Sequence, residues 1–281
     1  MNGSNVEIGW ESARRANQEN WEDRVPLHEA AYGLDAFDDP DHLSAVVRDD
    51  LDALTPFLPS KSVSGLELCH LQCHIGTDTV SFARVGARVT GVDFSPSALR
   101  VAAQLAARVG VDATWVETDV LDARAAVSGD FDVVYTSIGT ICWLDDLDKW
   151  AAQIVGLLRT GGTFFIRDGH PALNALDEEA PTLTARYPYF ATGHAQQWDD
   201  ASTYAGTGQV AHARTYEWPH SLSEILGALL RAGLRIVHFN EGRTLPWRFS
   251  ERMVEVPGGY AWPEAERDLL PCTYTIIARL D

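Results

Sequence analysis

Short apolar runs alternate with segments of helical periodicity from Gly65 onward, and this alternation limits the folds open to the chain. Such a pattern is typical of strand–helix units stacked around a mainly parallel sheet. We expect strands at residues 65–71, 88–93, 113–117, 131–137, 162–167, 234–240 and 272–279. The sequence therefore predicts an α/β fold with a seven-stranded, mostly parallel sheet.

Capping residues mark the helices between these strands. Ser, Asp and Pro favour helix starts, whereas Gly favours helix ends because it adopts the left-handed conformation without a Cβ clash. Three helices are predicted from such signals: residues 97–109 (Ser95 and Pro96 before, Gly110 after), 146–159 (Gly161 and Gly162 after), and a helix opened by the capping box of Ser221 and Glu224 and closed by Gly233.

The rest of the chain divides into a start and an insertion. Residues 1–60 are polar with a helical pattern that prolines close, so we expect an N-terminal helical cap or lid, followed by one domain over residues 61–281. The alternation breaks near residues 171–219, where a hairpin is expected near Tyr204 to Trp218 around Gly206 and Gly208. Insertions at the carboxyl edge of an open sheet usually shape a pocket. Residues 243–271, rich in Pro and Trp, are expected to reach this pocket or another subunit.

Charge and composition narrow the partners. The formal net charge is −18, from 40 acidic and 22 basic residues, which disfavours nucleic acid and anionic membrane surfaces. No apolar run reaches membrane-spanning length and the start lacks a signal-peptide core, so we expect a cytoplasmic protein, a monomer or homodimer. The four cysteines are expected to be free thiols in a reducing compartment.

Polar residues follow three successive strands and suggest a nucleoside site. The first strand runs into a tight loop at Gln72 to Gly76, where a helix start would expose backbone N–H groups. Asp93 ends the next strand, where a carboxylate can accept both ribose hydroxyls, and Asp119 follows the third, where it can accept an adenine amino group. Each aspartate alone is also a common cap or turn residue, so the prediction depends on their order.

The same order of loop and aspartates, followed by Phe131-Asp-Val-Val-Tyr-Thr-Ser137 and by Leu157-Leu-Arg-Thr-Gly-Gly162, resembles class I S-adenosylmethionine-dependent methyltransferases over about residues 63–168. The resemblance implies a Rossmann-like fold and S-adenosylmethionine as cofactor. It implies that the loop cradles the methionine part, that Asp93 with Phe94 holds the ribose and base, that Asp119 with Val120 holds the adenine, and that Thr136 to Ile138 flank the transferred methyl. The implied cofactor residues are Trp21, His70, Gln72, Cys73, His74, Gly76, Asp93, Phe94, Asp119, Val120, Thr136 and Ile138.

The loop departs from the family pattern acid-x-Gly-x-Gly-x-Gly, because it reads His70-Leu-Gln72-Cys-His74-Ile-Gly76. A branch of uncharacterised bacterial methyltransferases has a similar His-Leu-Gln-Cys-His loop, an upstream Trp-x-x-Arg-x-x-x-His pattern and a later His-Pro. This chain is similar to that branch at Trp21, Arg24, His28 and His170-Pro171. The resemblance implies that the N-terminal segment closes over cofactor and substrate. The expected substrate contacts are Arg24, His28, Trp143, His194 and Trp198.

A base is expected at His170, because it directly follows the fifth strand and so borders the crevice at the carboxyl edge. The alternative is a histidine that stabilises the turn before Pro171; His28, His194 and His220 are the other candidates. No metal is expected, since the Cys-His pairs of the loop lack a zinc spacing.

The function expected from these residues is methylation of a small molecule. O-methylation of a hydroxylated metabolite such as a sugar or natural product is preferred, with N-methylation of a small amine as the alternative. A nicotinamide-dependent oxidoreductase is a weaker alternative because the Gly-x-Gly-x-x-Gly loop is missing. A non-catalytic nucleoside-binding sensor also stays open.

Overall fold

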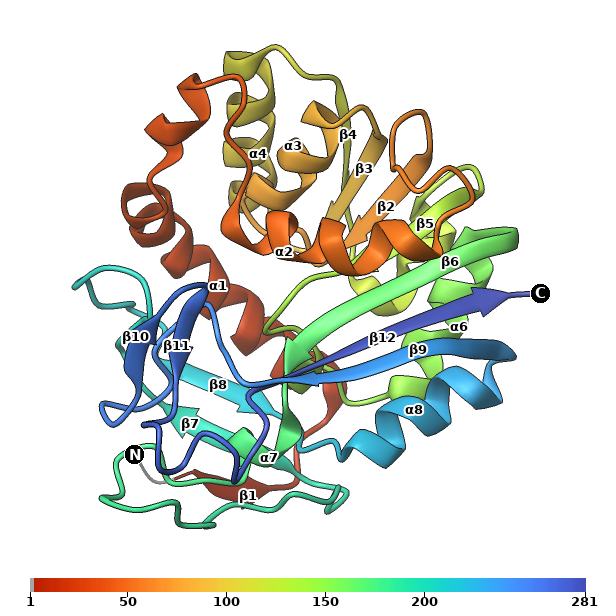
Figure 1. The fold of residues 1–281 in the computed structure, drawn as a ribbon. Helices are drawn as coiled ribbons and strands as arrows, with labels where there is room; N and C mark the ends of the chain where they lie inside the picture. The colour runs from red at the N-terminus through yellow and green to blue at the C-terminus, as the bar shows by residue number, and fades with distance from the viewer. Residues whose placement is uncertain (1–2) are drawn as a thin grey trace.

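The seven expected strands form one sheet in the order β4-β3-β2-β5-β6-β12-β9 in the computed structural model, which describes residues 3–281 (Figure 1). The pairs from β4 to β6 are parallel, whereas β12 is antiparallel to both β6 and β9. The strands are β2 (Glu67–Leu71), β3 (Arg88–Asp93), β4 (Ala113–Glu117), β5 (Phe131–Thr136), β6 (Leu158–Gly169), β9 (Leu234–Gly242) and β12 (Thr273–Leu280). The predicted α/β fold with a mostly parallel sheet is confirmed.

Helices cover both faces of the sheet because successive strand residues point to opposite sides. Leu68 and Phe165 belong to a core shared with α2 (Ala45–Leu54) and α3 (Thr77–Arg84). Their neighbours Cys69 and Phe164 belong to the core on the other face, with α6 (Leu147–Leu157) and α8 (Leu222–Arg231). The remaining helical segments of the sheet domain are α4 (Pro96–Val109), η3 (Val120–Asp122), α5 (Ala123–Ala126), η4 (Ile141–Trp143) and α7 (Pro171–Asn174).

The predicted capping signals are present. Ser95 accepts a hydrogen bond from the N–H of Ala98 at the start of α4, and Gly110 ends that helix with φ of 72°. Ser221 and Glu224 form the predicted capping box of α8. These helix boundaries depend on a few adjacent residues, so they can be predicted from the sequence.

One strand boundary was predicted wrongly. Residues 158–161 were expected to belong to a helix end and a glycine turn, but α6 ends at Leu157 and β6 begins at Leu158. Leu158 already pairs with Phe131, and the register with β5 then shifts before Thr163 pairs with Val133. Gly161, with φ of 81°, therefore lies in an irregularity inside the strand.

The helices of the N-terminal segment lie in two different places, one on a face of the sheet and one at its carboxyl edge. The segment forms β1 (Ser4–Val6), α1 (Trp10–Ala31), η1 (Leu34–Asp38), α2 and η2 (Thr55–Phe57). Helix α2 packs on the sheet face through Val47 and Leu54. Helix α1 instead crosses the carboxyl edge of the sheet and contacts α4 and β8 (Figure 1). Of the N-terminal helices, α1 is the one that lies at this edge, and its function as a lid stays a prediction.

The insertion contains a hairpin, but not at the predicted place. Its strands are β7 (Ala195–Asp199) and β8 (Arg214–Glu217), and β7 also pairs with β1. Gly206 and Gly208 lie in the long connection instead of a tight turn. A Cβ at Gly208 would lie 2.3 Å from the Leu27 side chain, so glycine lets the connection approach α1. A second hairpin, β10 (Val254–Val256) and β11 (Gly259–Ala261), follows.

A buried ion pair fixes α2 to the sheet. Asp50 has no exposed surface, accepts a hydrogen bond from the Tyr135 hydroxyl at 2.5 Å and pairs with the Arg167 guanidinium. Burial raises the pKa of Asp50 to about 6, although Arg167 and the Tyr135 hydroxyl act in the opposite direction. Loss of one partner would leave the other buried charge uncompensated, which is costly.

We therefore expect Asp50→Ala to lower the free energy of unfolding by about 3–5 kcal/mol, measured by urea denaturation. The matched control is Asp49→Ala, since Asp49 lies 3.7 Å from the same guanidinium but is exposed. That change is expected to cost under about 1 kcal/mol. Equal losses for the two variants would contradict a specific role for the buried pair.

Candidate functional site

The loop between β2 and α3 has a left-handed backbone at alternate residues. The φ angles are 57° at Gln72, 48° at His74 and 76° at Gly76. Residues with a side chain rarely adopt positive φ, and the conformation costs on the order of 1–2 kcal/mol each. The three positions are those at which the related loop pattern has glycine. Gln72 and His74 therefore have a φ that favours glycine, although each of them carries a side chain.

Two polar atoms near this loop are buried without a hydrogen-bond partner among the described residues. They are Oε1 of Gln72, after β2, and Oγ1 of Thr136, at the end of β5. The Nε2 of Gln72 donates to the Thr140 carbonyl at 3.3 Å, so its amide is oriented while its oxygen stays free. Buried polar atoms usually have partners, and such exceptions favour a ligand site.

The two predicted aspartates end neighbouring strands at the same edge. Asp93, which is 7% exposed, accepts hydrogen bonds from the N–H groups of His74 at 2.8 Å and Ser95 at 2.9 Å. Burial raises its pKa to about 6. Asp119 accepts from the N–H of Leu121 at 2.8 Å, the turn role considered as its alternative, and burial raises its pKa as well. Val120 is buried in the core beside it.

One face of α1 lies on this edge. Arg14 is 3.7 Å from the Asp119 carboxylate, and the Gln18 amide donates to the Phe94 carbonyl at 2.6 Å. One turn further, Glu22 accepts hydrogen bonds from the hydroxyls of Ser95 and Ser97, both at 2.5 Å. Because residues four apart share a helix face, α1 contacts the ends of β3 and β4 along its length.

Aromatic residues continue this contact at the loop. His28 has no exposed surface; its Nδ1 is 2.9 Å from Nε2 of His74, and its Nε2 is 2.7 Å from the Thr203 hydroxyl in the insertion. The Trp21 ring lies 5.2 Å from the His74 ring and 5.5 Å from the Trp143 ring. Arg24 stacks over Trp21 at 5.3 Å. The structure thus brings Trp21, Arg24, His28, His74 and Trp143 together.

Other predicted site residues lie apart from this cluster. His70 is 1% exposed, and its two ring nitrogens face the hydroxyls of Thr79 at 2.8 Å and Ser137 at 3.1 Å. Cys73 is buried beside Gly91, and Ile138 packs against an apolar cluster formed by the start of the insertion and residues 245–272. His194 is exposed, and the Trp198 ring makes an edge-to-face contact with the Tyr187 ring, with the ring centroids 5.0 Å apart.

His170 makes the capping contact considered as the alternative to its role as a base. Its Nδ1 accepts the N–H of Ala172 at 3.1 Å, at the start of α7. Its Nε2 lies 3.0 Å from the Glu241 carboxylate. Burial lowers the pKa of His170, and Glu241 opposes this shift. A catalytic role for this ring stays a prediction.

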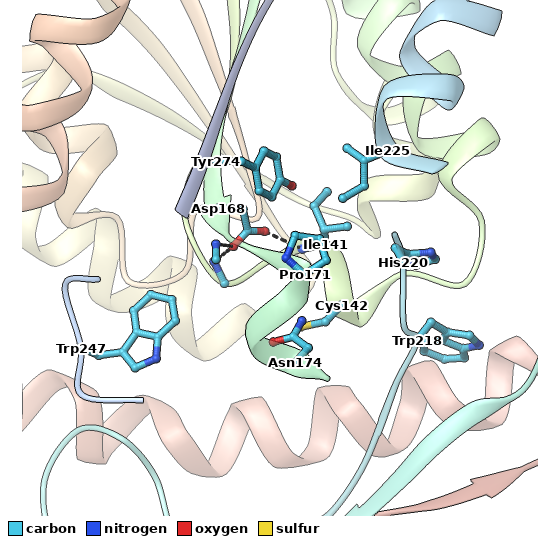
Figure 2. Close-up of a pocket in the computed structure, with 12 residues that line it drawn as sticks. Ile141, Cys142, Asp168, Pro171, Asn174, Trp218, His220, Ile225, Trp247 and Tyr274 are labelled. Carbon is cyan, nitrogen blue, oxygen red and sulfur yellow. Dashed lines mark hydrogen bonds between the residues drawn. The ribbon is translucent and has the colours of Figure 1, made fainter. Parts of the chain in front are cut away.

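A cavity of about 90 Å³ lies between the end of β5, the end of β6 and the insertion (Figure 2). Asp168 lies at its wall and accepts hydrogen bonds from the N–H groups of Gly139, Thr140 and Ile141, which fixes the loop after β5. His220 and Tyr274 also line it. Asp168 and Tyr274 were not predicted as site residues. Asp168 lies at the end of β6, and Tyr274 lies near the start of the antiparallel β12, whose beginning reaches the same edge.

Metal-ligand geometry and membrane-spanning helices are both absent from residues 3–281. No three His, Cys, Asp or Glu side chains gather as metal ligands in that range. In the same part of the chain, no helix combines the length and the apolarity needed to cross a bilayer. The cysteines Cys69, Cys73, Cys142 and Cys272 are free thiols.

The central segment of the chain is similar to known proteins. A family described as "Methyltransferase domain" matches residues 69–164. The ubiquinone biosynthesis O-methyltransferase of Methylobacterium sp. (strain 4-46) is 30% identical over 108 residues, 38% of this chain and 43% of that protein. An uncharacterised protein of Mycobacterium tuberculosis (strain ATCC 25618 / H37Rv) is 27% identical over 154 residues, 52% of this chain and 56% of its own length. The chain spans about half the length of these curated relatives.

Solved structures share the fold over most of the chain. An S-adenosylmethionine-dependent methyltransferase from Clostridium acetobutylicum ATCC 824 has a TM-score of 0.58 at 12% identity, covering 84% of this chain and 91% of that one. One from Mesorhizobium loti has a TM-score of 0.54 at 21% identity, covering 88% of this chain and 100% of that one. Residues 69–164 are therefore similar to a methyltransferase domain, and the expected Rossmann-like fold is confirmed.

The left-handed backbone at Gln72 can be tested by comparing Gly with Ala. Ala would keep the strain of positive φ, whereas Gly would not, so we expect Gln72→Gly to be about 1 kcal/mol more stable than Gln72→Ala. At Cys73, whose φ is not positive, the order is expected to reverse. Urea denaturation of the four variants measures both differences. The same order at the two positions would contradict the loop conformation.

The burial of His28 leads us to expect a loss of stability in mild acid. Burial, with the Arg24 charge, lowers its pKa from 6.5 to about 4, so as the pH falls the unfolded chain takes up the proton first. The contribution of neutral His28 to the free energy of unfolding is complete above its pKa in the unfolded chain. It is lost as the pH falls toward its pKa in the folded protein. From about pH 7.5 to about pH 5.5, the wild type is expected to lose about 1 kcal/mol more than His28→Gln. Urea denaturation at both pH values measures this, with the exposed His194→Gln as control; parallel losses would contradict it.

Proposed function

We propose that the protein is an S-adenosylmethionine-dependent methyltransferase that acts on a small molecule. The observation that carries the proposal is the left-handed loop 72–76 joined to Asp93 through the N–H of His74, at the carboxyl edge of a sheet in methyltransferase order. Ligands of open α/β sheets bind at this edge, where the strand order reverses. The similarity of residues 69–164 to a methyltransferase domain supports the same function.

The residues present fit this cofactor. The unpartnered oxygens of Gln72 and Thr136 are acceptors beside the loop, where a ligand's ammonium group would find partners. Asp93 offers a carboxylate to ribose hydroxyls, with Phe94 beside it, and Asp119 offers one to the adenine amino group. When bound, the cofactor supplies an activated methyl group. Trp21, His28 and His74 would exclude water from the loop side of the site.

A small acceptor is favoured by charge and by the size of the cavity. The net charge of −18 opposes a nucleic-acid substrate, and about 90 Å³ next to Gly139 and Ile141 suits the end of a small molecule. We propose O-methylation of a hydroxylated metabolite, with N-methylation of a small amine as the alternative. Arg24, His28 and Trp143 are the proposed substrate contacts from the lid side, with Trp198 and His194 from the insertion.

Cofactor binding can be tested directly. We expect S-adenosylhomocysteine to bind the wild type in isothermal titration calorimetry, and Asp93→Ala to weaken binding at least about tenfold, since the variant loses hydrogen bonds from a charged acceptor. Asp112→Ala, an exposed aspartate before β4, is the matched control and should bind as the wild type does. Absence of binding to the wild type, or tight binding of reduced nicotinamide dinucleotide instead, would overturn the proposal. Binding without transfer of label from S-adenosylmethionine to any metabolite in a pool would indicate a sensor.

A further inference from the structure

His220 has one ring nitrogen fixed by the backbone, and the ring lines the cavity. Its Nε2 lies 2.6 Å from the Leu144 carbonyl oxygen. A carbonyl only accepts hydrogen bonds, so Nε2 carries the hydrogen and Nδ1 of the neutral ring carries the lone pair. Burial lowers the pKa of His220, which favours this neutral form. The neutral ring is thus in the tautomer whose Nδ1 can accept a proton.

Three buried histidines have different hydrogen-bond partners. Both ring nitrogens of His28 and of His70 have hydrogen-bond partners in the protein. The Nδ1 lone pair of His170 is used by the N–H of Ala172. Because a base needs an accessible lone pair within reach of the proton it removes, His220 fits this role better than these three do.

A second polar atom shares the cavity. Tyr274 is 1% exposed, and its hydroxyl has no hydrogen-bond partner among residues 3–281 although it belongs to the cavity wall (Figure 2). The rest of the wall includes the apolar side chains of Ile141, Ile225, Trp218 and Trp247. A cavity of about 150 Å³ holds benzene. This one, of about 90 Å³, is smaller and so admits only the reactive end of an acceptor. A hydroxyl group on an apolar scaffold would satisfy both the wall and the free Tyr274 hydroxyl.

We propose that His220 is the general base for a hydroxylated aromatic acceptor, such as a phenol, whose hydroxyl group lies in this cavity and accepts a hydrogen bond from Tyr274. This inference rests on the proposed function. The acceptor oxygen uses a lone pair to form the new O–C bond while the bond between methyl carbon and sulfur breaks, its electron pair staying on sulfur. The hydroxyl proton moves to Nδ1 of His220 and then to solvent. A neutral amine attacks through its lone pair and needs no such base.

Four other titratable groups lie near the ring or in the same pocket. Asp168 is held by backbone N–H groups, Glu224 by Ser221, and burial raises the pKa of the Cys142 thiol well above its usual range. Glu217, near Cys142, has its pKa raised to about 7 by burial, so it titrates in the neutral range. The pH profile of His220→Gln separates the two groups, because that variant keeps Glu217.

The experiment measures methyl transfer from labelled S-adenosylmethionine to phenol, catechol and 4-nitrophenol, and to aniline as the matched amine. In His220→Gln the amide can still donate to Leu144 but has no basic nitrogen. We expect it to lower kcat for phenols about 100-fold or more and to abolish the fall of the rate at low pH. S-adenosylhomocysteine affinity should stay within about twofold, because none of the proposed cofactor residues lines the cavity that holds the ring. Tyr274→Phe should lower kcat for phenols at least about tenfold.

His238→Gln is the control, and its kcat should match that of the wild type. His238 belongs to the edge strand β9, where its ring contacts Phe57 of η2. The inference is overturned if His220→Gln keeps the low-pH fall, if His170→Gln abolishes it instead, or if aniline alone is methylated. It is also overturned if S-adenosylhomocysteine binds but no phenol is methylated. If S-adenosylhomocysteine does not bind, the proposed function itself is contradicted. If His220→Gln lowers the thermal midpoint, a second test is methyl transfer by His220→Ala with and without added imidazole. If imidazole does not restore activity, the role of His220 as the base is contradicted.

Discussion

The left-handed backbone at residues 72, 74 and 76 is the constraint on which the rest of the edge depends. It turns the chain from β2 into α3 within a few residues and directs the N–H of His74 at Asp93, so that two strand ends are joined. The same conformation projects the side chains of Gln72 and His74 outward, one to the loop after β5 and the other to His28 on α1. Glycine would have given the turn without those side chains. Strain accepted at a site is usually offset elsewhere in the fold, and here the apolar cores on both sheet faces are the offset.

Costly polar burial is concentrated at the carboxyl edge. Burial raises the pKa of Asp93 and lowers the pKa of His28 to about 4, and both shifts favour the uncharged form of the side chain. The strand interiors behind them are apolar on both faces. Sites that bind polar ligands often violate the rules that the rest of the structure obeys, because the ligand supplies the missing partners. The unpartnered oxygens of Gln72 and Thr136 are consistent with that arrangement.

The sequence predicted the features that are local. Strand positions follow from short apolar runs, and the caps at Ser95 and Ser221 from two or three adjacent residues. It did not predict the pairing of β1 with β7, because Val6 and Ala195 are distant in the chain and only the fold brings them together. The insertion hairpin was misplaced for the same reason, since its glycines serve contact with α1 instead of a tight turn. The cavity was incompletely predicted because its wall combines the end of a parallel strand, at Asp168, with the start of an antiparallel one, at Tyr274.

The position of His220 shows that the proposed cofactor edge and the proposed acceptor cavity are built by different means. The edge is formed by strand ends and a strained loop, so its geometry follows from the sheet. His220 stands immediately before the capping box of α8, and the N–H of Trp218 donates to the Cys142 carbonyl at 2.8 Å. The insertion is thereby joined to the loop after β5 on one side and to a rigid helix start on the other. A change in the length or sequence of the insertion would alter the cavity wall while leaving loop 72–76 and Asp93 in place. Acceptor choice can therefore diverge in such chains without disturbing the edge that would hold the methyl donor.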